Sequence, residues 1–259
     1  NKHNKPGVFV TGCGYEKGIF KGAEHSSPWL GHFNVLFPNK LYKLSHNSPG
    51  IFQDIAECAE CLGQFNHPPN PANFDGYEYR AAGKDKVRLM EFNGGPWADK
   101  LPWFFKALDN GWTLSPSWNE DNHHKKWGDD PQGTLIWATE LSRPAIRGAV
   151  AARRTAAVGD KGASIKVLAD DKCWMGSELK GFGKTTLAVT LRDKQEGDGF
   201  TNVTLYGNKG KKLNEKSCGD KNPCAVDFTE NITSAGYLVV VARQKDGGWL
   251  VSAPIWYDK

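Results

Sequence analysis

Short apolar runs separated by turn-forming residues recur along the whole chain, and most of them have the length of a strand. Before residue 160 they predict strands at 8–11, 33–37, 62–65, 87–92, 112–114 and 135–138. Longer segments between these runs predict helices at 49–61, 103–110 and 143–154. Pro49 and Pro144 stand where helices begin, and Gly111 stands where one ends. Alternating strands and helices predict an α/β domain with a largely parallel sheet.

The pattern changes near residue 160, where helical segments stop. Short strands are predicted at 164–168, 185–191, 202–206, 225–228, 237–243 and 249–253, with turns rich in Gly, Asp, Lys and Asn between them. Closely spaced strands of this kind are typical of a β-sandwich. We therefore expect an α/β domain over 1–158 and a β-sandwich domain over 159–259, with 158–162 as the linker.

Composition removes several classes of protein. Of the 259 residues, 39% are hydrophobic and 24% are charged, which is enough apolar material for a sizeable core and excludes a disordered chain. No stretch approaches the ~20 apolar residues that a membrane-spanning helix needs. The formal net charge of +4 is compatible with a polyanionic partner but does not require one.

Six cysteines and two sequons indicate an oxidising compartment. Cys218 and Cys224 flank a polar turn and predict a disulfide. Cys58 and Cys61 lack a second such pair that would complete a zinc site, so they predict a disulfide or two structural thiols. The sequons predict glycosylation at Asn202 and Asn231. We expect a secreted protein, and because the first residues form no signal peptide, a mature or trimmed chain.

Carboxylates and imidazoles follow or open several of the predicted strands. The residues concerned are Glu16, His32, His67, Asp121 and His123. Each alone has an ordinary structural explanation, such as a solvated carboxylate or a histidine in a turn. Strand ends in α/β domains gather functional side chains, however, and a mixed carboxylate and imidazole set suits zinc, manganese or iron.

The order of the motifs is similar to that of a known family. The motifs are Gly14-Tyr-Glu16, Gly31-His32-Phe-Asn34, Gln64-Phe-Asn-His67-Pro68, Ala107-Leu-Asp-Asn-Gly-Trp112 and Asn119-Glu-Asp121-Asn-His123, followed by 141–155 and the last strand at 249–256. Together they resemble the polymerase-and-histidinol-phosphatase (PHP) superfamily, in particular its secreted CehA/McbA-like branch with an appended β domain.

The resemblance implies a distorted β/α barrel, incomplete in this chain, that holds divalent metal ions and hydrolyses phosphoesters. Glu16 would be the bridging carboxylate, and His32 and His67 would complete one metal site with it. Asp121 and His123 would serve further ions. Glu16, His67 and Asp121 would then be the catalytic residues, with one or two ions of zinc, manganese or iron as cofactor.

The family's first His-x-His strand and its later Asp-His motif are not in this sequence. The amino-terminal piece could be a separate fragment, the chain could be a shortened relative that uses one or two ions, or the scaffold could be reused for binding. A barrel without its first strands has an open edge, which a separate N-terminal fragment or a homodimer contact would cover.

The sequence is therefore compatible with two functions. The first is a secreted metal-dependent phosphoester hydrolase, with nucleic acid among its candidate substrates. The alternative is a non-catalytic binding or toxin-like protein that recognises a glycan or a surface. The missing His-x-His strand favours binding, whereas the retained carboxylate and histidine set favours the hydrolase.

Overall fold

A computed structural model describes residues 14–21, 28–40, 42–69, 73–93, 96–122 and 128–258. The chain divides into two compact units. Unit 1 comprises Asn1–Leu114 and Trp137–Ala151, and unit 2 comprises Ser115–Ile136 and Ala152–Lys259. The predicted strand at 8–11 lies outside the described residues. The domain boundary after residue 158 stays a prediction.

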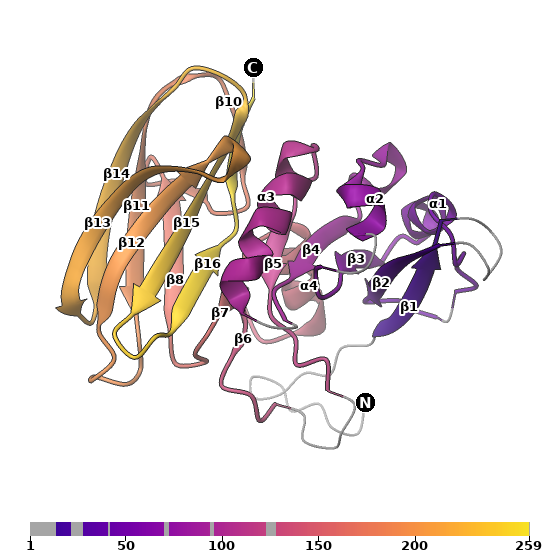
Figure 1. The fold of residues 1–259 in the computed structure, drawn as a ribbon, viewed down its shortest axis with the longest axis horizontal. Coiled ribbons are helices and arrows are strands. Elements are labelled where there is room, and N and C mark those ends of the chain that lie inside the picture. Colours follow the sequence, from indigo (N-terminus) through magenta and orange to yellow (C-terminus); the bar gives the residue numbers. More distant parts are fainter. Residues whose placement is uncertain are drawn as a thin grey trace. The chain divides into compact units, whose positions relative to one another are not determined.

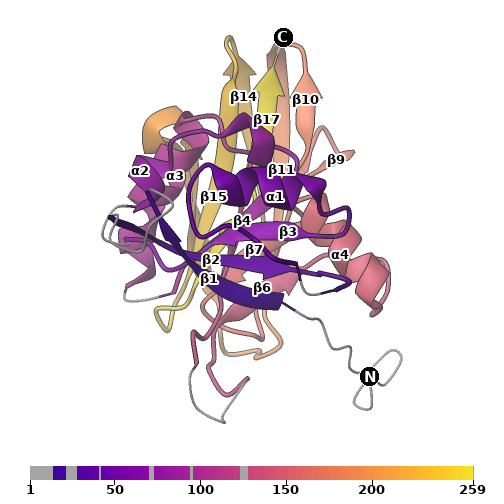
Figure 2. The same ribbon diagram turned by 90° about the vertical axis from the view of Figure 1, so that its right-hand side faces the viewer.

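Unit 1 combines a small sheet with short helices. Its strands are β1 (Gly14–Phe20), β2 (Trp29–Leu36), β3 (Leu62–Phe65) and β4 (Val87–Glu91). Its helices are α1 (Gly50–Glu57), α2 (Asn73–Tyr77), α3 (Leu101–Asp109) and α4 (Arg143–Ala151), with 3-10 turns at Ala81–Gly83 and Trp97–Lys100. Figure 2 shows β4, β3, β2 and β1 stacked in that order. β2 pairs antiparallel with both β1 and β3, whereas β3 and β4 run parallel.

The register of this sheet separates a polar face from an apolar face. Successive side chains of a strand point to opposite sides, so directly paired residues share a face. Asn34 pairs with both Glu16 and Gln64, which places these polar residues on one side of the sheet. Phe33 pairs with Phe65 on the other side.

Aromatic side chains form the core beneath the apolar face. Phe65 is fully buried, and five aromatic rings surround it with centroids 4.7 to 6.2 Å away. These rings belong to Phe33, Phe52, Phe74, Tyr77 and Trp112. Aromatic side chains bury large areas each and prefer tilted or edge-to-face contacts of this kind, so this cluster anchors the sheet.

Unit 2 consists almost entirely of strands. They are β5 (Ser115–Ser117), β6 (Gly133–Ile136), β7 (Thr155–Val158), β8 (Ser164–Ala169), β9 (Cys173–Trp174), β10 (Glu178–Lys180), β11 (Gly183–Arg192), β12 (Phe200–Gly207), β13 (Lys211–Lys221), β14 (Cys224–Ile232), β15 (Gly236–Gln244), β16 (Trp249–Ser252) and β17 (Ile255–Asp258). A 3-10 turn at Asn208–Gly210 joins β12 to β13.

Apart from β5, these strands form two facing sheets (Figure 1). One sheet has the order β14-β11-β8-β9. The other runs β10-β17-β15-β16-β7-β6, with β12 also paired to β15 and β13 paired to β12. The alternating burial of β8 and β11 places every second side chain between the layers. The predicted β-sandwich is therefore confirmed.

The predicted β/α barrel is wrong. The described residues form three sheets and no closed barrel, with 44% of the residues in strands and 18% in helices. A β/α barrel needs a helical crossover between successive parallel strands. β1 instead pairs antiparallel with β2, the next strand along the chain, and β2 pairs antiparallel with β3. The described fold points to a β-sandwich rather than a barrel.

Two disulfides are present in the described chain. One joins Cys58 to Cys61, and the other joins Cys218 to Cys224 across the turn between β13 and β14. Disulfides persist in oxidising compartments, which fits an extracellular or periplasmic location. Among the described helices, none combines the length and the apolar character required to cross a bilayer.

Removing the Cys218–Cys224 disulfide is expected to destabilise the protein by about 2 kcal/mol. The two cysteines are six residues apart, and closing so short a loop removes that much chain entropy from the unfolded state. The measurement is urea unfolding of the double variant Cys218→Ser/Cys224→Ser. Cys173→Ser is the control because Cys173 is not in a disulfide, and it should change the free energy of unfolding by less than ~0.5 kcal/mol. Equal stabilities for the double variant and the control would contradict this expectation.

Candidate metal centre

Glu16, His32 and His67 meet at the polar face of the sheet in unit 1. Glu16 lies on β1, His32 on β2, and His67 follows the end of β3. Gly18 pairs directly with His32, and Glu16 is two residues before it on the same face, so the carboxylate and the imidazole are diagonal neighbours. One ligand atom of each of the three residues lies within 4.8 Å of the others.

The distances within this group are those of metal ligands. His32 Nδ1 lies 3.0 Å from His67 Nε2 and 3.3 Å from Glu16 Oε1. Two ligands bound about 2.0–2.1 Å from a tetrahedral zinc ion lie about 3.3 Å apart. A single ring nitrogen carries at most one proton, so Nδ1 cannot donate fully to both neighbours. The described chain thus contains a possible metal-binding group.

A chain of two buried side-chain amides orients the Glu16 carboxylate. Asn66 Nδ2 donates to Glu16 Oε2 at 2.6 Å, and Gln64 Nε2 donates to Asn66 Oδ1 at 3.1 Å. Gln64 and Asn66 are 1% and 2% exposed, so solvent cannot replace these bonds. The amide of Asn66 occupies one carboxylate oxygen and leaves Oε1 directed at His32.

His67 is held in an unusual backbone conformation. Its φ is 28°, a positive value that residues other than glycine seldom adopt. Such a backbone conformation costs about 1–3 kcal/mol. The His67 backbone N–H donates to Glu91 Oε2 at 2.6 Å, at the end of β4. This bond to a buried carboxylate offsets the strain and fixes the turn that presents the imidazole.

Lys100 provides a compensating charge near Glu91. Glu91 is 2% exposed and Lys100 is 1% exposed. Burial lowers the pKa of Lys100, and the carboxylates of Asp99 and Glu91 oppose that change. A buried carboxylate needs such a counter-charge, so this pair supports the residue that positions His67.

The ligand group itself is open to solvent on one side. The side chains of Glu16 and His32 are each 35% exposed. The indole of Trp29 packs edge-on against His32 with the ring centroids 4.9 Å apart, which restricts the orientation of that imidazole. The site therefore combines fixed ligand atoms with access for water and for a ligand from solution.

The structure does not test the two remaining predicted ligands. Asp121 is exposed and belongs to unit 2, where its φ is 47°. His123 lies outside the described residues. Their contribution to the metal centre stays a prediction.

Sequence reasoning missed the supporting residues Gln64, Asn66 and Glu91. A signal for Glu91 was available, because a carboxylate inside the apolar run 87–92 is a charge that the fold must bury and pair. Gln64 and Asn66 alternate with apolar residues in the same way, but only the strand register shows that their face carries Glu16.

The predicted glycosylation sites both lie on strands of unit 2. Asn202 is the third residue of β12, and its Nδ2 donates to Glu215 Oε2 at 3.1 Å. Asn231 is exposed near the end of β14. Glycosylation at either residue stays a prediction.

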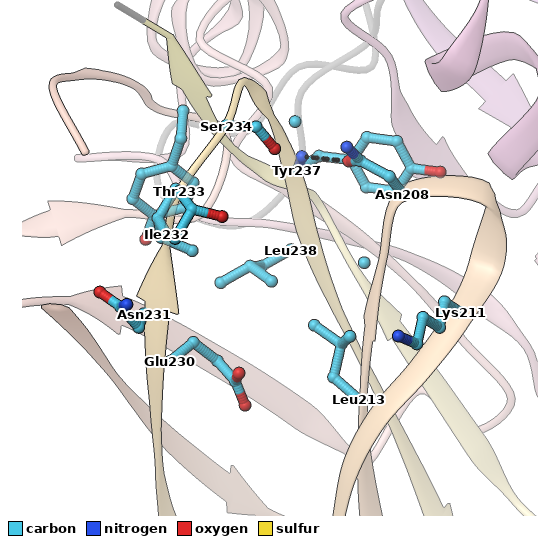
Figure 3. A pocket seen from close by; sticks show the side chains of 13 residues that line it. Asn208, Lys211, Leu213, Glu230, Asn231, Ile232, Thr233, Ser234, Tyr237 and Leu238 are labelled. Carbon is cyan, nitrogen blue, oxygen red and sulfur yellow. Dashed lines mark hydrogen bonds between the residues drawn. The ribbon is translucent and has the colours of Figure 1, made fainter. Parts of the chain in front are cut away.

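A separate cavity of about 410 Å³ opens in unit 2 (Figure 3). Leu213 and Leu238 lie at its centre, and Asn208 accepts a hydrogen bond from the backbone of Tyr237 at 2.9 Å. Its described lining contains one carboxylate, Glu230, and one ammonium group, Lys211. This volume suits a small ligand, but a single acid among these residues makes neither a metal site nor an acid–base pair.

Comparison with known proteins gives no family for this chain. No family model matches it, and no curated protein matches it. Solved structures with partial likeness include a superoxide reductase (neelaredoxin) from Ignicoccus hospitalis, with 16% identity and a TM-score of 0.28 over 37% of this chain and 80% of that one. Another is the sulfur carrier protein SoxY from Chlorobium limicola f thiosulfatophilum, with 13% identity and a TM-score of 0.26 over 39% and 82%. Likeness at this level assigns neither an activity nor a metal.

Proposed function

We propose that Glu16, His32 and His67 bind a divalent metal ion, and that the protein uses it to hydrolyse phosphoesters. The observation that carries the proposal is the convergence of one carboxylate oxygen and two ring nitrogens within 4.8 Å of one another on a solvent-accessible face. Nitrogen and oxygen donors in this combination suit zinc, manganese or iron.

The residues around the ligands have distinct tasks in this proposal. Asn66 orients the carboxylate of Glu16, and Glu91 fixes the turn that carries His67. The open side of the site leaves positions for water and for a phosphoryl oxygen. A bound divalent ion supplies Lewis-acid chemistry and makes water nucleophilic near neutral pH. The protein's part is to hold the donor atoms at fixed distances and to keep one side accessible.

Phosphoesters are the proposed substrate class because the motifs around these ligands resemble those of the PHP superfamily. The net charge of +4 is compatible with polyanionic substrates such as nucleic acid. The two disulfides fit an extracellular or periplasmic location, and of these two we propose that the enzyme is secreted. The described residues form no β/α barrel, so the proposal depends on the ligand group and the motifs around it and not on the fold.

Metal analysis of the purified chain tests the proposal. We expect about one zinc, manganese or iron ion per chain and hydrolysis of bis-p-nitrophenyl phosphate that chelation reduces to background. Adding back one of the three ions should restore the activity. A metal-free protein with no metal-dependent hydrolysis would contradict the proposal and favour the binding protein considered at the sequence level.

Asn66→Ala is expected to weaken metal binding by ~10–100-fold without unfolding the chain. The substitution removes the hydrogen bond to Glu16 Oε2, and supporting bonds of this kind have that effect on metal affinity. Competition with a chromogenic chelator measures the dissociation constant. Asn34→Ala is the matched control, because Asn34 shares the polar face and is only partly buried. Equal affinities for the two variants would show that Asn66 does not orient Glu16.

A further inference from the structure

A second group of oxygen donors lies in unit 2. One carboxylate oxygen each of Asp160, Asp193 and Asp198 lies within 4.8 Å of the others. Asp160 belongs to the loop between β7 and β8, whereas Asp193 and Asp198 belong to the loop between β11 and β12. All three donor atoms of this group are oxygens, whereas two of the three donors in the Glu16 group are imidazole nitrogens.

Backbone amides fix two of the three carboxylates. The N–H of Gly162 donates to Asp160 Oδ1 at 2.6 Å, and the N–H of Gln195 donates to Asp193 Oδ1 at 2.7 Å. A Cβ at position 162 would lie 2.9 Å from Asp193 Oδ1, so glycine is what allows the two loops to approach. In the part of the chain that the structure describes, no lysine or arginine forms an ion pair with these three carboxylates.

Gln244 provides an independent sign of a missing partner. It lies at the end of β15, is 3% exposed, and is turned toward the acidic group because its Nε2 donates to Asp193 Oδ2 at 2.8 Å. Its Oε1 is buried and accepts no hydrogen bond. An unsatisfied buried oxygen is costly, and native structures seldom leave one without an ion or a water.

The turn between β15 and β16 lies beside this oxygen. A Cβ on Gly248 would lie 2.3 Å from Gln244 Oε1 and 3.0 Å from Asp246 Oδ1, so both oxygens lie against the turn between β15 and β16. The carboxylates of Asp246, Asp193 and Asp160 all act electrostatically on Asp198. The folded chain therefore concentrates negative charge where a cation would neutralise it.

We propose that Asp160, Asp193 and Asp198, together with the amide oxygen of Gln244, bind a calcium ion that ties two loops of the β-sandwich to the end of β15. Calcium takes six to eight oxygen ligands from carboxylates, amide oxygens and water, and tolerates irregular geometry. Magnesium demands near-octahedral geometry and keeps most of its waters, so it fits a site built from two loops and a strand end less well.

Asp198→Asn is the most informative variant. The structure gives the Asp198 side chain no hydrogen bond, so the substitution removes one negative charge with little effect on folding. We expect the full-length chain, after chelation and dialysis, to bind one calcium ion by titration calorimetry and to unfold at a higher temperature with calcium. Asp198→Asn should bind calcium at least ~10-fold more weakly and lose most of the calcium-induced shift.

Without calcium, Asp198→Asn should unfold at the same temperature as the unmodified chain or a higher one, since it relieves repulsion. Asp227→Asn is the charge-matched control, because Asp227 is exposed on β14 and outside the site. It should leave calcium binding unchanged, as should His67→Ala, which separates this proposal from the metal centre in unit 1. No calcium binding, equal binding by Asp198→Asn and Asp227→Asn, or magnesium affinity equal to that of calcium would overturn the proposal.

Discussion

Replacing His67 by alanine is expected to abolish metal binding and metal-dependent hydrolysis. The imidazole supplies one of three donor atoms that lie within 4.8 Å of one another, and two remaining donors hold a divalent ion poorly. The loss should exceed the ~10–100-fold effect expected for a supporting residue such as Asn66. Metal content by mass spectrometry and the rate of bis-p-nitrophenyl phosphate hydrolysis measure the two effects together.

Glu16→Gln provides a second, more conservative test of the same site. The amide keeps the size of the side chain but loses the charge, so it should reduce metal content while the fold is unchanged. His46→Ala is the histidine control, because His46 is exposed and lies outside the ligand group. If His67→Ala retained stoichiometric metal and full activity, the metal centre would have to lie elsewhere in the chain.

The β-sandwich was predictable because its inner strands alternate in a simple way. In β8 every second residue is buried, and the same holds for most of β11. β13 was not predictable, because it reads Lys-Lys-Leu-Asn-Glu-Lys-Ser and all but one of its residues are exposed. Among the described strands it pairs with β12 alone, and charged residues on such an edge strand oppose pairing with other chains.

The antiparallel pairing in unit 1 could not be predicted from local patterns, because the pattern of a strand does not indicate the direction of its neighbours. The run 33–37 alternates equally well in a parallel and an antiparallel sheet. The direction is decided by the pairing of β2 with β1 and β3, which involves residues distant along the chain.

The same limit applies to the site. Glu16, His32 and His67 could be nominated by residue type, but the roles of Asn66 and Glu91 follow from register and from the turn after β3.

Phe65→Ala is expected to lower the free energy of unfolding by about 3–5 kcal/mol. Phe65 is fully buried among five aromatic rings, and truncating it removes a large apolar area and leaves a cavity that the rigid neighbours cannot fill. Chemical denaturation monitored by tryptophan fluorescence and circular dichroism measures the change. Phe182→Ala is the control because Phe182 is 40% exposed in unit 2, and it should cost less than ~0.5 kcal/mol.

The contrast between Phe65 and His67 tests how the sheet in unit 1 is organised. The two residues are separated by Asn66 alone, yet Phe65 belongs to the apolar face and His67 to the polar end of the strand. Phe65→Ala should reduce stability and leave metal affinity of the folded chain within a few-fold of its original value. His67→Ala should abolish metal binding, and in the absence of metal it should leave the free energy of unfolding nearly unchanged. A large loss of stability in metal-free His67→Ala would mean that the imidazole serves packing, and that the strained turn is not maintained for ligand binding.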